Sequence, residues 1–436
     1  MKNEIINVKD AFLREEYDLI HHESGLTIYV FRKKLGTAYV SLSTAFGSLD
    51  NCFSLPNEET SVSLPDGVAH FLEHKMFESE DHIDTFDKFA AVGASANAFT
   101  SNEVTSYLFS TSGDIAKPLS ILLDYVFHPY FTEENVKKEQ GIIAQEIGMY
   151  DDSPFNRLYY AMMESLYQHH GIRRNICGSV ESISTITPEL LNTCFRAFYH
   201  PKNMTLIVCG KISVEEVLSL ADKYIPLCAW ELPERIYPEE PKEVLRKEFS
   251  FSMDVARPIV CLGIKDTERV GDPSAKVSRA LCMNLLADLL FGSGTDFYDS
   301  LYRKGLISPD FSVSYESTNG CGHLLFSAST DDPSSLLRAL KEESALYQKG
   351  EKKISPSDFE RIRRVHFAEF VKDFDSTEEI ASALLDAVID GVSIFETGKL
   401  LQKITKEDVE DVIKVFLHED NAAEVVLYPE KGKEIC

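Results

Sequence analysis

One short motif constrains the fold of this chain more than any other feature of its sequence. Residues 70–77 read His-Phe-Leu-Glu-His-Lys-Met-Phe, so that His70 and His74 lie four positions apart. On a helix, side chains with this spacing project from one face, about 5–6 Å apart, and both imidazoles can reach one divalent metal ion. Glu73 shares that face. Apolar residues around the motif predict a buried helix, in which two histidines without a metal would be costly.

The order His-x-x-Glu-His is the inverted form of a zinc-peptidase motif. A catalytic zinc site needs three protein ligands and one open position, so a second segment must supply the third ligand. We expect the motif helix to span 66–78, with Asp66 as its N-cap. The fold must therefore bring a distant side chain to this helix.

A long helix predicted over 132–150 is the candidate for that second segment. Acidic residues at its start suit the helix macrodipole, and the run Asp-Asp-Ser-Pro at 151–154 ends it. Glu139 and Glu146 lie on one stripe of this helix, about 10 Å apart along its axis. One of them can complete a His-His-Glu set while the other lies two turns away. The spacing leaves open which one does so.

Further motifs accompany these two helices. Residues 93–100 read Gly-Ala-Ser-Ala-Asn-Ala-Phe-Thr, and Tyr-His-Pro at 199–201 leads into an apolar strand. Together with His-x-x-Glu-His and the later Glu-x6-Glu, this pattern resembles the pitrilysin/insulinase (M16) metallopeptidases. Within that family, the sequence of these motifs most resembles that of the short bacterial M16B proteins of the YmfH type. The resemblance covers the N-terminal half closely and the C-terminal half loosely.

The resemblance implies a zinc endopeptidase and assigns roles to residues of the two helices. It implies that Glu146 joins His70 and His74 as the third zinc ligand. It also implies that Glu139 assists catalysis as a second carboxylate. Glu73 is expected to be the general base, because it can reach a metal-activated water without being a ligand.

We expect the peptide substrate to add as a strand beside residues 96–101. An exposed strand edge offers main-chain hydrogen bonds that are indifferent to side-chain sequence. Asn97, Ala98 and Phe99 would then bind the substrate backbone, and Phe77 would line the pocket beside the scissile bond. The alternative is that this segment is a buried structural strand.

The order of predicted elements indicates an α+β layer structure that occurs twice. In the first half we expect strands at 27–32, 38–46, 95–111 (a pair) and 204–209, and helices at 66–78, 83–92, 115–127, 132–150, 155–169, 188–198 and 214–224. In the second half we expect strands near 248–265, 310–328 and 423–428, and helices at 275–291, 333–348, 355–373 and 376–390.

These elements divide the chain into two expected domains. Residues 1–226 form a domain that carries the zinc site, the proline-containing stretch 227–247 reads as a linker, and residues 248–436 form a domain without metal ligands. The M16 resemblance implies two structurally similar LuxS/MPP-like α/β-roll domains. Each would be an antiparallel sheet with helices on one side.

Composition excludes several other classes of protein. The formal net charge of −26 argues against nucleic-acid binding, which needs a cationic surface. Nine cysteines without a Cys-x-x-Cys pair indicate reduced thiols, so we expect no cysteine zinc site. We expect no membrane-spanning helix and no signal peptide, and therefore a cytoplasmic protein. The histidine pairs at 21–22 and 169–170 are expected at the surface.

One departure from the family pattern concerns the second half. Active M16 peptidases use an Arg and a Tyr from this region to stabilise the substrate carbonyl. When the corresponding stretch is aligned on its Leu and Gly-Leu residues, Tyr302 falls at the Arg position and Ser308 at the Tyr position. Arg303 lies one place away, a turn of about 100° on a helix. The chain therefore lacks the expected oxyanion donors at their positions.

This departure suggests a partner. Our hypothesis is a heterodimer, in which a second M16-like subunit contributes the Arg and the Tyr. A homodimer that uses Arg303 with Tyr302 or Tyr315 is the competing hypothesis. Two alternatives to a peptidase remain: a non-proteolytic M16-type scaffold or binding subunit, and a metal-dependent hydrolase of a small ester or amide. Leader-peptide removal and general peptide turnover are both compatible with the sequence.

Overall fold

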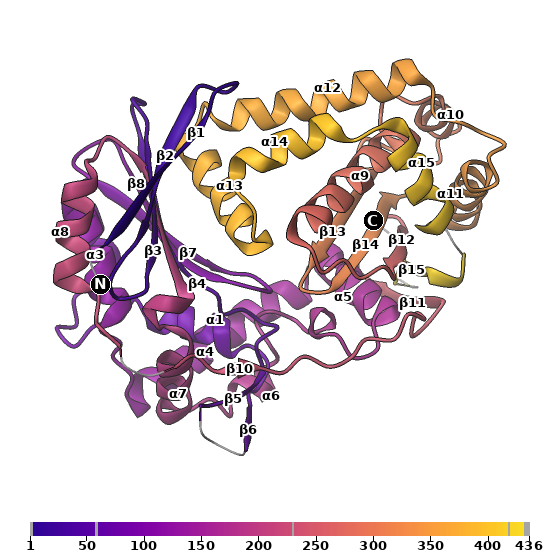
Figure 1. Ribbon diagram of the computed structural model, residues 1–436. Coiled ribbons are helices and arrows are strands. Elements are labelled where there is room, and N and C mark those ends of the chain that lie inside the picture. Colours follow the sequence, from indigo (N-terminus) through magenta and orange to yellow (C-terminus); the bar gives the residue numbers. More distant parts are fainter. Residues whose placement is uncertain (1–2, 57–59, 229–230, 417–418, 431–436) are drawn as a thin grey trace. The chain divides into compact units, whose positions relative to one another are not determined.

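Contacts divide the chain into two compact units whose segments alternate along the sequence (Figure 1). The computed structural model describes residues 3–56, 60–228, 231–416 and 419–430. Unit 1 comprises the chain up to Ile147, Arg174–Tyr237 and Val371–Ile389. Unit 2 comprises Gly148–Arg173, Pro238–Phe370 and the chain from Asp390 onwards.

Unit 1 is built on a seven-stranded sheet with the order β1-β2-β3-β9-β4-β8-β7. Its strands are β1 (Glu4–Asp10), β2 (Glu15–His21), β3 (Thr27–Arg32), β4 (Ala38–Thr44), β7 (Ala94–Thr100), β8 (Thr105–Thr111) and β9 (Met204–Gly210). All neighbouring strands are antiparallel except the parallel pair β3 and β9. Strand β7 pairs with β8 and forms one edge of this sheet.

Helices cover the core face of this sheet. They are α1 (Val68–Lys75), α2 (Thr85–Ala91), α3 (Ala116–Phe127), α4 (Glu133–Asp151), α6 (Val180–Ile183), α7 (Pro188–Phe198) and α8 (Val214–Tyr224). Because strand side chains alternate between faces, Val40 and Leu42 of β4 enter this core. A small sheet, β10 (Glu234–Arg235), β5 (Cys52–Ser54) and β6 (Ser61–Ser63), completes the unit.

The opposite face of the same sheet meets a helix from far along the chain. Tyr39 of β4 points away from Val40 and lines a small cavity together with Ala381 and Leu385. Those two residues belong to α13 (Thr377–Asp390). The approach to α13 also packs on the sheet, since the Phe31 and Phe374 rings lie 6.1 Å apart. Helix α13 is expected from the sequence, but its place in unit 1 is not.

Unit 2 is built on a five-stranded sheet with the order β11-β15-β12-β14-β13. Its strands are β11 (Glu248–Met253), β12 (Ile259–Asp266), β13 (Ser312–Thr318), β14 (Cys321–Ser329) and β15 (Ala422–Pro429), and only β11 and β15 pair in parallel. Its helices are α5 (Pro154–Leu166), α9 (Pro273–Phe291), α10 (Asp296–Arg303), α11 (Pro333–Gln348), α12 (Pro356–Asp373), α14 (Ile394–Lys403) and α15 (Lys406–Phe416).

Two apolar clusters lie on the two faces of the unit 2 sheet. Val260 and Leu262 of β12 pack with α9 in the first cluster. The alternate residues Ile259 and Cys261 pack with Met162 of α5 in the second. The expected sheet with helices is therefore present in both units. In each unit, a segment from the other half of the sequence covers the second face.

The expected elements are found, and the structure adds several that the sequence did not indicate. The additions are β1, β2, β5, β6, β10, α6, α10, α14 and α15. Strand β1 is mostly exposed, so it has no buried stripe that a pattern could show. The prediction of Asp66 as N-cap is wrong: the cap is Gly67, which has φ 91° and no side-chain bond to the helix.

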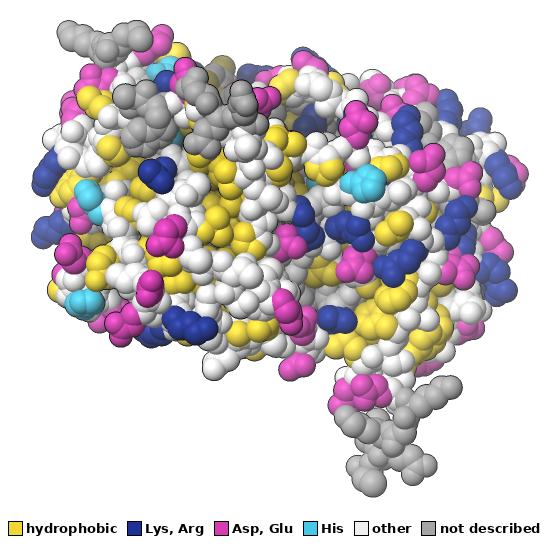
Figure 2. Space-filling model, turned by 90° about the horizontal axis from the view of Figure 1, so that it is seen from below, with side chains coloured by type: hydrophobic (Ala, Val, Ile, Leu, Met, Phe, Trp, Pro, Cys, Tyr) yellow, Lys and Arg dark blue, Asp and Glu magenta, His cyan; other side chains and the backbone are white. Residues whose placement is uncertain are grey.

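The chain passes between units at Tyr237 and Pro238, inside the predicted linker 227–247. The linear limits at 226 and 248 stay a prediction, because the contacts give interleaved units. Within the described residues, no helix is long and apolar enough to span a bilayer. On the face shown in Figure 2, acidic and basic side chains are interspersed among apolar ones.

We predict that Tyr167→Phe destabilises unit 2 by about 1–3 kcal/mol, the usual cost of leaving buried polar groups unpaired. Tyr167 is fully buried just after α5, where its hydroxyl donates to Gly322 O at 2.9 Å and lies 2.9 Å from His323 Nδ1. Urea denaturation measures the loss. The matched control is Tyr159→Phe, whose hydroxyl has only a 3.4 Å bond to an exposed carboxylate. Equal losses in both variants would contradict this account of how α5 is held.

Candidate metal centre

Helix α1 presents three polar side chains within an otherwise apolar core. His70 and Glu73 are buried, and His74 is partly exposed. The ring centroids of His70 and His74 lie 4.6 Å apart. The local sequence explains this placement: Phe71 and Leu72 fill the core on the other faces of the helix. The two imidazoles therefore face the same space, as the four-residue spacing predicts.

Helix α4 brings both candidate carboxylates to these imidazoles. Glu146 Oε1 lies 3.6 Å from His70 Nε2, and Glu146 Oε2 lies 3.4 Å from His74 Nε2. Glu139 Oε1 instead lies 3.1 Å from His74 Nδ1, on the other side of that ring. This geometry agrees with Glu146 as the third ligand and Glu139 as a supporting carboxylate. The roles themselves remain predictions.

The donor set fits zinc. Zinc binds imidazole nitrogen at about 2.0–2.1 Å and carboxylate oxygen at about 2.0–2.2 Å, so tetrahedral ligands lie roughly 3.4 Å apart. Each Nε2 atom lies close to that separation from one oxygen of Glu146, His70 from Oε1 and His74 from Oε2. The outer nitrogen of His74 has a carboxylate partner, as is usual for a ligand. His70 Nδ1 has no hydrogen-bond partner among the described residues.

A buried lysine stabilises the supporting carboxylate. Lys75 is fully buried, and its Nζ lies 2.8 Å from Glu78 Oε1 and 3.5 Å from Glu139 Oε2. Burial raises the pKa of Glu139, but the hydrogen bond to His74 and the charge of Lys75 outweigh it, so the net pKa is lowered. Burial lowers the pKa of His74, but the hydrogen bond to Glu139 and nearby carboxylates raise it overall. No sequence pattern indicated a role for Lys75.

The expected general base is held by the edge strand. Thr100 Oγ1, at the end of β7, donates a hydrogen bond of 2.6 Å to Glu73 Oε2. This contact fixes one carboxylate oxygen of Glu73 and ties α1 to β7. Thr100 belongs to the motif Asn-Ala-Phe-Thr, but the sequence pattern gave it no role.

A cavity of about 1060 Å³ opens beside these side chains in unit 1. Among the residues that line it are Glu73, His74, Phe77, Asn97 and Ala98. The candidate base, one candidate ligand and three of the four expected substrate-binding residues therefore share one space. The edge strand β7 forms part of its wall.

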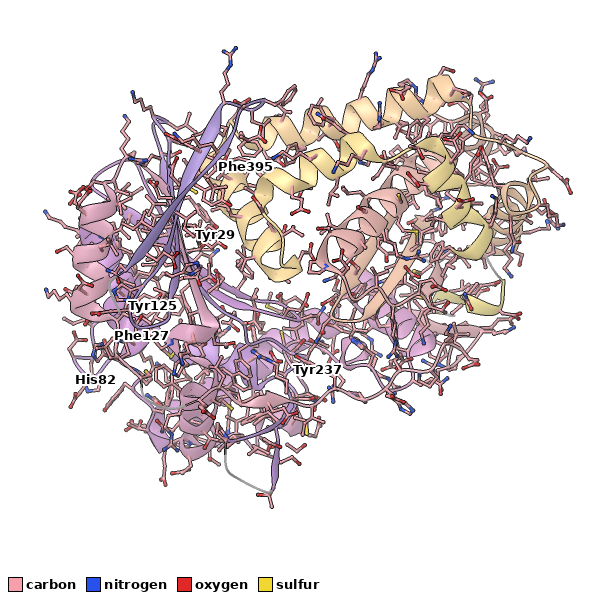
Figure 3. The ribbon with its side chains drawn as sticks, viewed as in Figure 1. Tyr29, His82, Tyr125, Phe127, Tyr237 and Phe395 are labelled. Carbon is pink, nitrogen blue, oxygen red and sulfur yellow. The ribbon has the colours of Figure 1, made fainter. Side chains whose placement is uncertain are left out.

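The cavity wall at Phe77 is built from stacked aromatic rings. The Phe77 ring stacks on Phe86 at 4.5 Å and on Tyr125 at 5.4 Å. Tyr125 is labelled in Figure 3. His82, which is labelled there too, is one of the residues that line the cavity. The fourth expected binding residue differs: Phe99 lines the smaller cavity, of about 150 Å³, beside α13. Alternation along β7 explains this difference, because Phe99 points to the face opposite Thr100.

One residue that the sequence did not single out lies beside the two imidazoles. Cys177 Sγ is 3.8 Å from His70 Nε2. The ligand atoms of His70, Glu146 and Cys177 all lie within 4.8 Å of one another. Burial, followed by the charges of Glu146 and Glu73, raises the pKa of the Cys177 thiol to about 12.

The residues considered as oxyanion donors lie in unit 2. Arg303 of α10 is exposed and pairs with Asp299 at 3.1 Å, and Tyr302 is 52% exposed. Tyr315 donates its hydroxyl to Asp266 Oδ2 at 2.9 Å, so that group is engaged within its own unit. Ser308 donates to the nearby Asp310 at 2.5 Å.

Comparison with known proteins gives consistent matches. Residues 63–179 match the family model Insulinase (Peptidase family M16), and residues 185–365 match the Peptidase M16 inactive domain. The chain is 38% identical over 414 residues to the uncharacterized zinc protease YmfH of Bacillus subtilis, covering 93% of this chain and 96% of that protein. It is 28% identical over 258 residues to the zinc protease YmxG of the same organism, covering 57% and 61%. These zinc proteases imply that the metal is zinc.

Solved structures agree with the fold. An M16-like peptidase from Alicyclobacillus acidocaldarius has a TM-score of 0.88 at 31% identity, and the match covers 99% of each chain. A protease from Helicobacter pylori has a TM-score of 0.81 at 20% identity, covering 95% of this chain and 100% of that one. The second likeness concerns the fold alone.

We predict that Glu139→Gln still binds one zinc per chain, with affinity reduced about 10–100-fold, as is typical when an outer partner is lost. The amide can still accept a hydrogen bond from His74, but it leaves Lys75 with less compensating charge. Competition with a chromophoric chelator measures the affinity. The control His74→Ala should lose the metal. Zinc retained by Glu146→Gln but lost by Glu139→Gln would reverse the assignment of the two carboxylates.

Proposed function

Because the chain belongs to the insulinase family of zinc proteases, peptidase family M16, we propose that it is a zinc-dependent endopeptidase acting on peptides or unfolded protein segments. One observation carries the proposal. Glu73 and His74 share a cavity of about 1060 Å³ with the backbone of an edge strand. A base, a metal ligand and a template for extended chains are the parts that peptide hydrolysis needs.

The edge strand supports a peptide as the substrate. In the described sheet, β7 pairs on one side with β8, so its other side can pair with an extended peptide. At about 1060 Å³ the cavity lies just above the range of about 300–1,000 Å³ for small-molecule sites, which favours a peptide over a small ester. A folded protein cannot supply an extended segment without unfolding. Leader-peptide removal and general peptide turnover both satisfy this requirement.

Chemical roles follow from the contacts of each side chain. Zinc held by His70, His74 and Glu146 would supply a Lewis acid for the scissile carbonyl and would lower the pKa of a water molecule. Glu73 accepts the proton of the attacking water and passes it to the leaving amine. Thr100 keeps Glu73 oriented through its 2.6 Å hydrogen bond. Glu139 and Lys75 hold the His74 ring in one orientation.

We also propose that a second M16-like subunit completes the site with an Arg and a Tyr and helps to enclose the substrate in a chamber. The support is the sequence departure at 302–308, together with the surroundings of the local candidates. Arg303 forms a pair with Asp299, and the hydroxyl of Tyr315 is bonded to Asp266. A homodimer that uses Arg303 and Tyr302 is the competing arrangement.

We predict that Glu73→Gln retains zinc and loses about 10²–10⁴-fold in kcat, because only the proton acceptor is removed. Cleavage of a mixture of unstructured peptides, followed by mass spectrometry, measures the rate alongside zinc content. A zinc-loaded wild-type protein that cleaves nothing, even with its partner, would favour the non-proteolytic scaffold instead. Wild-type turnover in Glu73→Gln would refute the assigned base.

We predict that Thr100→Val lowers kcat about 10–100-fold, with little change in KM or zinc content, because Glu73 loses the donor that orients it. Thr100→Ser keeps the hydroxyl and should restore most of the rate. If Thr100→Val and Thr100→Ser were equally impaired, the methyl group and not the hydroxyl would matter.

We predict that the isolated chain is about 10²–10³-fold slower than the complete complex, the usual cost of missing oxyanion donors. Peptidase assays of the purified chain, with and without a co-purified M16-like subunit, measure this ratio. Full activity of the chain alone, unchanged by Arg303→Ala, would exclude the partner requirement. Activity of the chain alone that Arg303→Ala abolishes would support the homodimer.

A further inference from the structure

The segment that carries Cys177 packs directly on the residues at the start of α1. A Cβ on Gly67 would lie 2.4 Å from Cys177 O, and a Cβ on Gly178 would lie 2.3 Å from Asp66 O. Both glycines also have left-handed φ values, of 91° and 74°. Ser182 adds a 2.7 Å hydrogen bond from its hydroxyl to Asp66 O. Main-chain contacts therefore set the position of Cys177 relative to α1.

From this position, the sulfur of Cys177 lies close to the ligand atoms of His70 and Glu146. Cys177 Sγ is 3.8 Å from His70 Nε2, and Glu146 Oε1 is 3.6 Å from the same nitrogen. Bond lengths of about 2.0–2.1 Å for nitrogen and 2.3 Å for sulfur place two tetrahedral zinc ligands roughly 3.6 Å apart. The ligand atoms of all three residues lie within 4.8 Å of one another, so side-chain adjustment around one ion would bring them to bonding distance.

We propose that Cys177 is a fourth protein ligand of the zinc, so that the resting site consists of two imidazoles, one carboxylate and one thiolate. The thiol binds as a thiolate and releases its proton to solvent when the metal enters. This inference rests on the proposed zinc site of His70, His74 and Glu146, and it does not require that peptides be cleaved.

A fourth protein donor has two consequences. Four-coordinate zinc sites with only protein ligands are closed, whereas catalytic sites keep an open position. The resting enzyme is therefore latent, and the sulfur must leave the metal before a peptide is hydrolysed. A thiolate also favours zinc over harder divalent ions such as magnesium or manganese. Cys177 thus regulates the site while it retains the metal.

X-ray absorption at the zinc edge tests the inference on the full-length protein, loaded with one equivalent of zinc under reducing conditions. We expect one sulfur scatterer at about 2.3 Å beside nitrogen and oxygen at about 2.0 Å. The sulfur should disappear in Cys177→Ala. The matched control is Cys194→Ala, a buried thiol in the apolar core of unit 1, which should keep the sulfur signal.

Zinc affinity and turnover provide the other two measurements. Cys177→Ala should bind zinc more weakly than the wild type, by more than the roughly 10–100-fold expected for an outer partner. Its peptide cleavage per bound zinc should exceed that of the wild type. Faster cleavage would support latency, and a rate no higher than wild type would overturn latency while the ligand assignment stood.

The spectra separate failure of this inference from failure of the proposed function. Zinc bound to the wild type through nitrogen and oxygen alone would overturn Cys177 as a ligand and leave the proposed peptidase intact. A wild-type chain that binds no zinc would overturn both proposals. A sulfur signal that persists in Cys177→Ala and disappears in Cys194→Ala would place the thiolate ligand elsewhere in the chain.

Discussion

The centre of unit 1 depends on ionisable side chains that are buried between α1, α4 and β7. His70, Glu73, Lys75 and Glu139 each have less than a tenth of their surface exposed. A buried charge is costly unless it is paired and hydrogen-bonded. Glu73 receives its bond from Thr100, and Lys75 lies beside Glu139. Among the described residues His70 Nδ1 has no hydrogen-bond partner, whereas its Nε2 lies 3.6 Å from Glu146 Oε1. The buried polar side chains of the site therefore depend on one another for their hydrogen bonds and charge pairing.

A second constraint is that the central strands β4 and β12 are buried on both faces of their sheets. Each sheet already has a helical layer on one face, and a sheet face left in water would lose the free energy of burial. Each half of the sequence supplies a helix to the other unit. Helix α13 covers the second face of the unit 1 sheet, and α5 covers the second face of the unit 2 sheet. Neither half of the sequence is therefore self-sufficient. This explains why contacts do not divide the chain at one point in 227–247, although the linker lies there.

Several errors of the sequence analysis have the same physical origin. His22 and His170 were expected at the surface, but both are buried. His22 lies 2.9 Å from Asp222 Oδ1, and His170 Nε2 lies 3.2 Å from Asn319 O. Their partners are 200 and 149 positions away in the sequence, so no local pattern could show them. Strand β1 was missed because its residues are mostly exposed and form no apolar stripe.

The sequence by itself determined the chemistry of the site and the kind of fold. Helical periodicity is a local property, so the spacing of His70, Glu73 and His74 already specifies one face that suits a metal and a base. Which carboxylate faces both imidazoles, which hydroxyl orients Glu73 and which sulfur lies beside His70 were decided only by tertiary structure. Thr100 and Cys177 reach α1 across 27 and 107 positions. Such contacts depend on how strands and loops pack, and packing is a property of the whole folded chain.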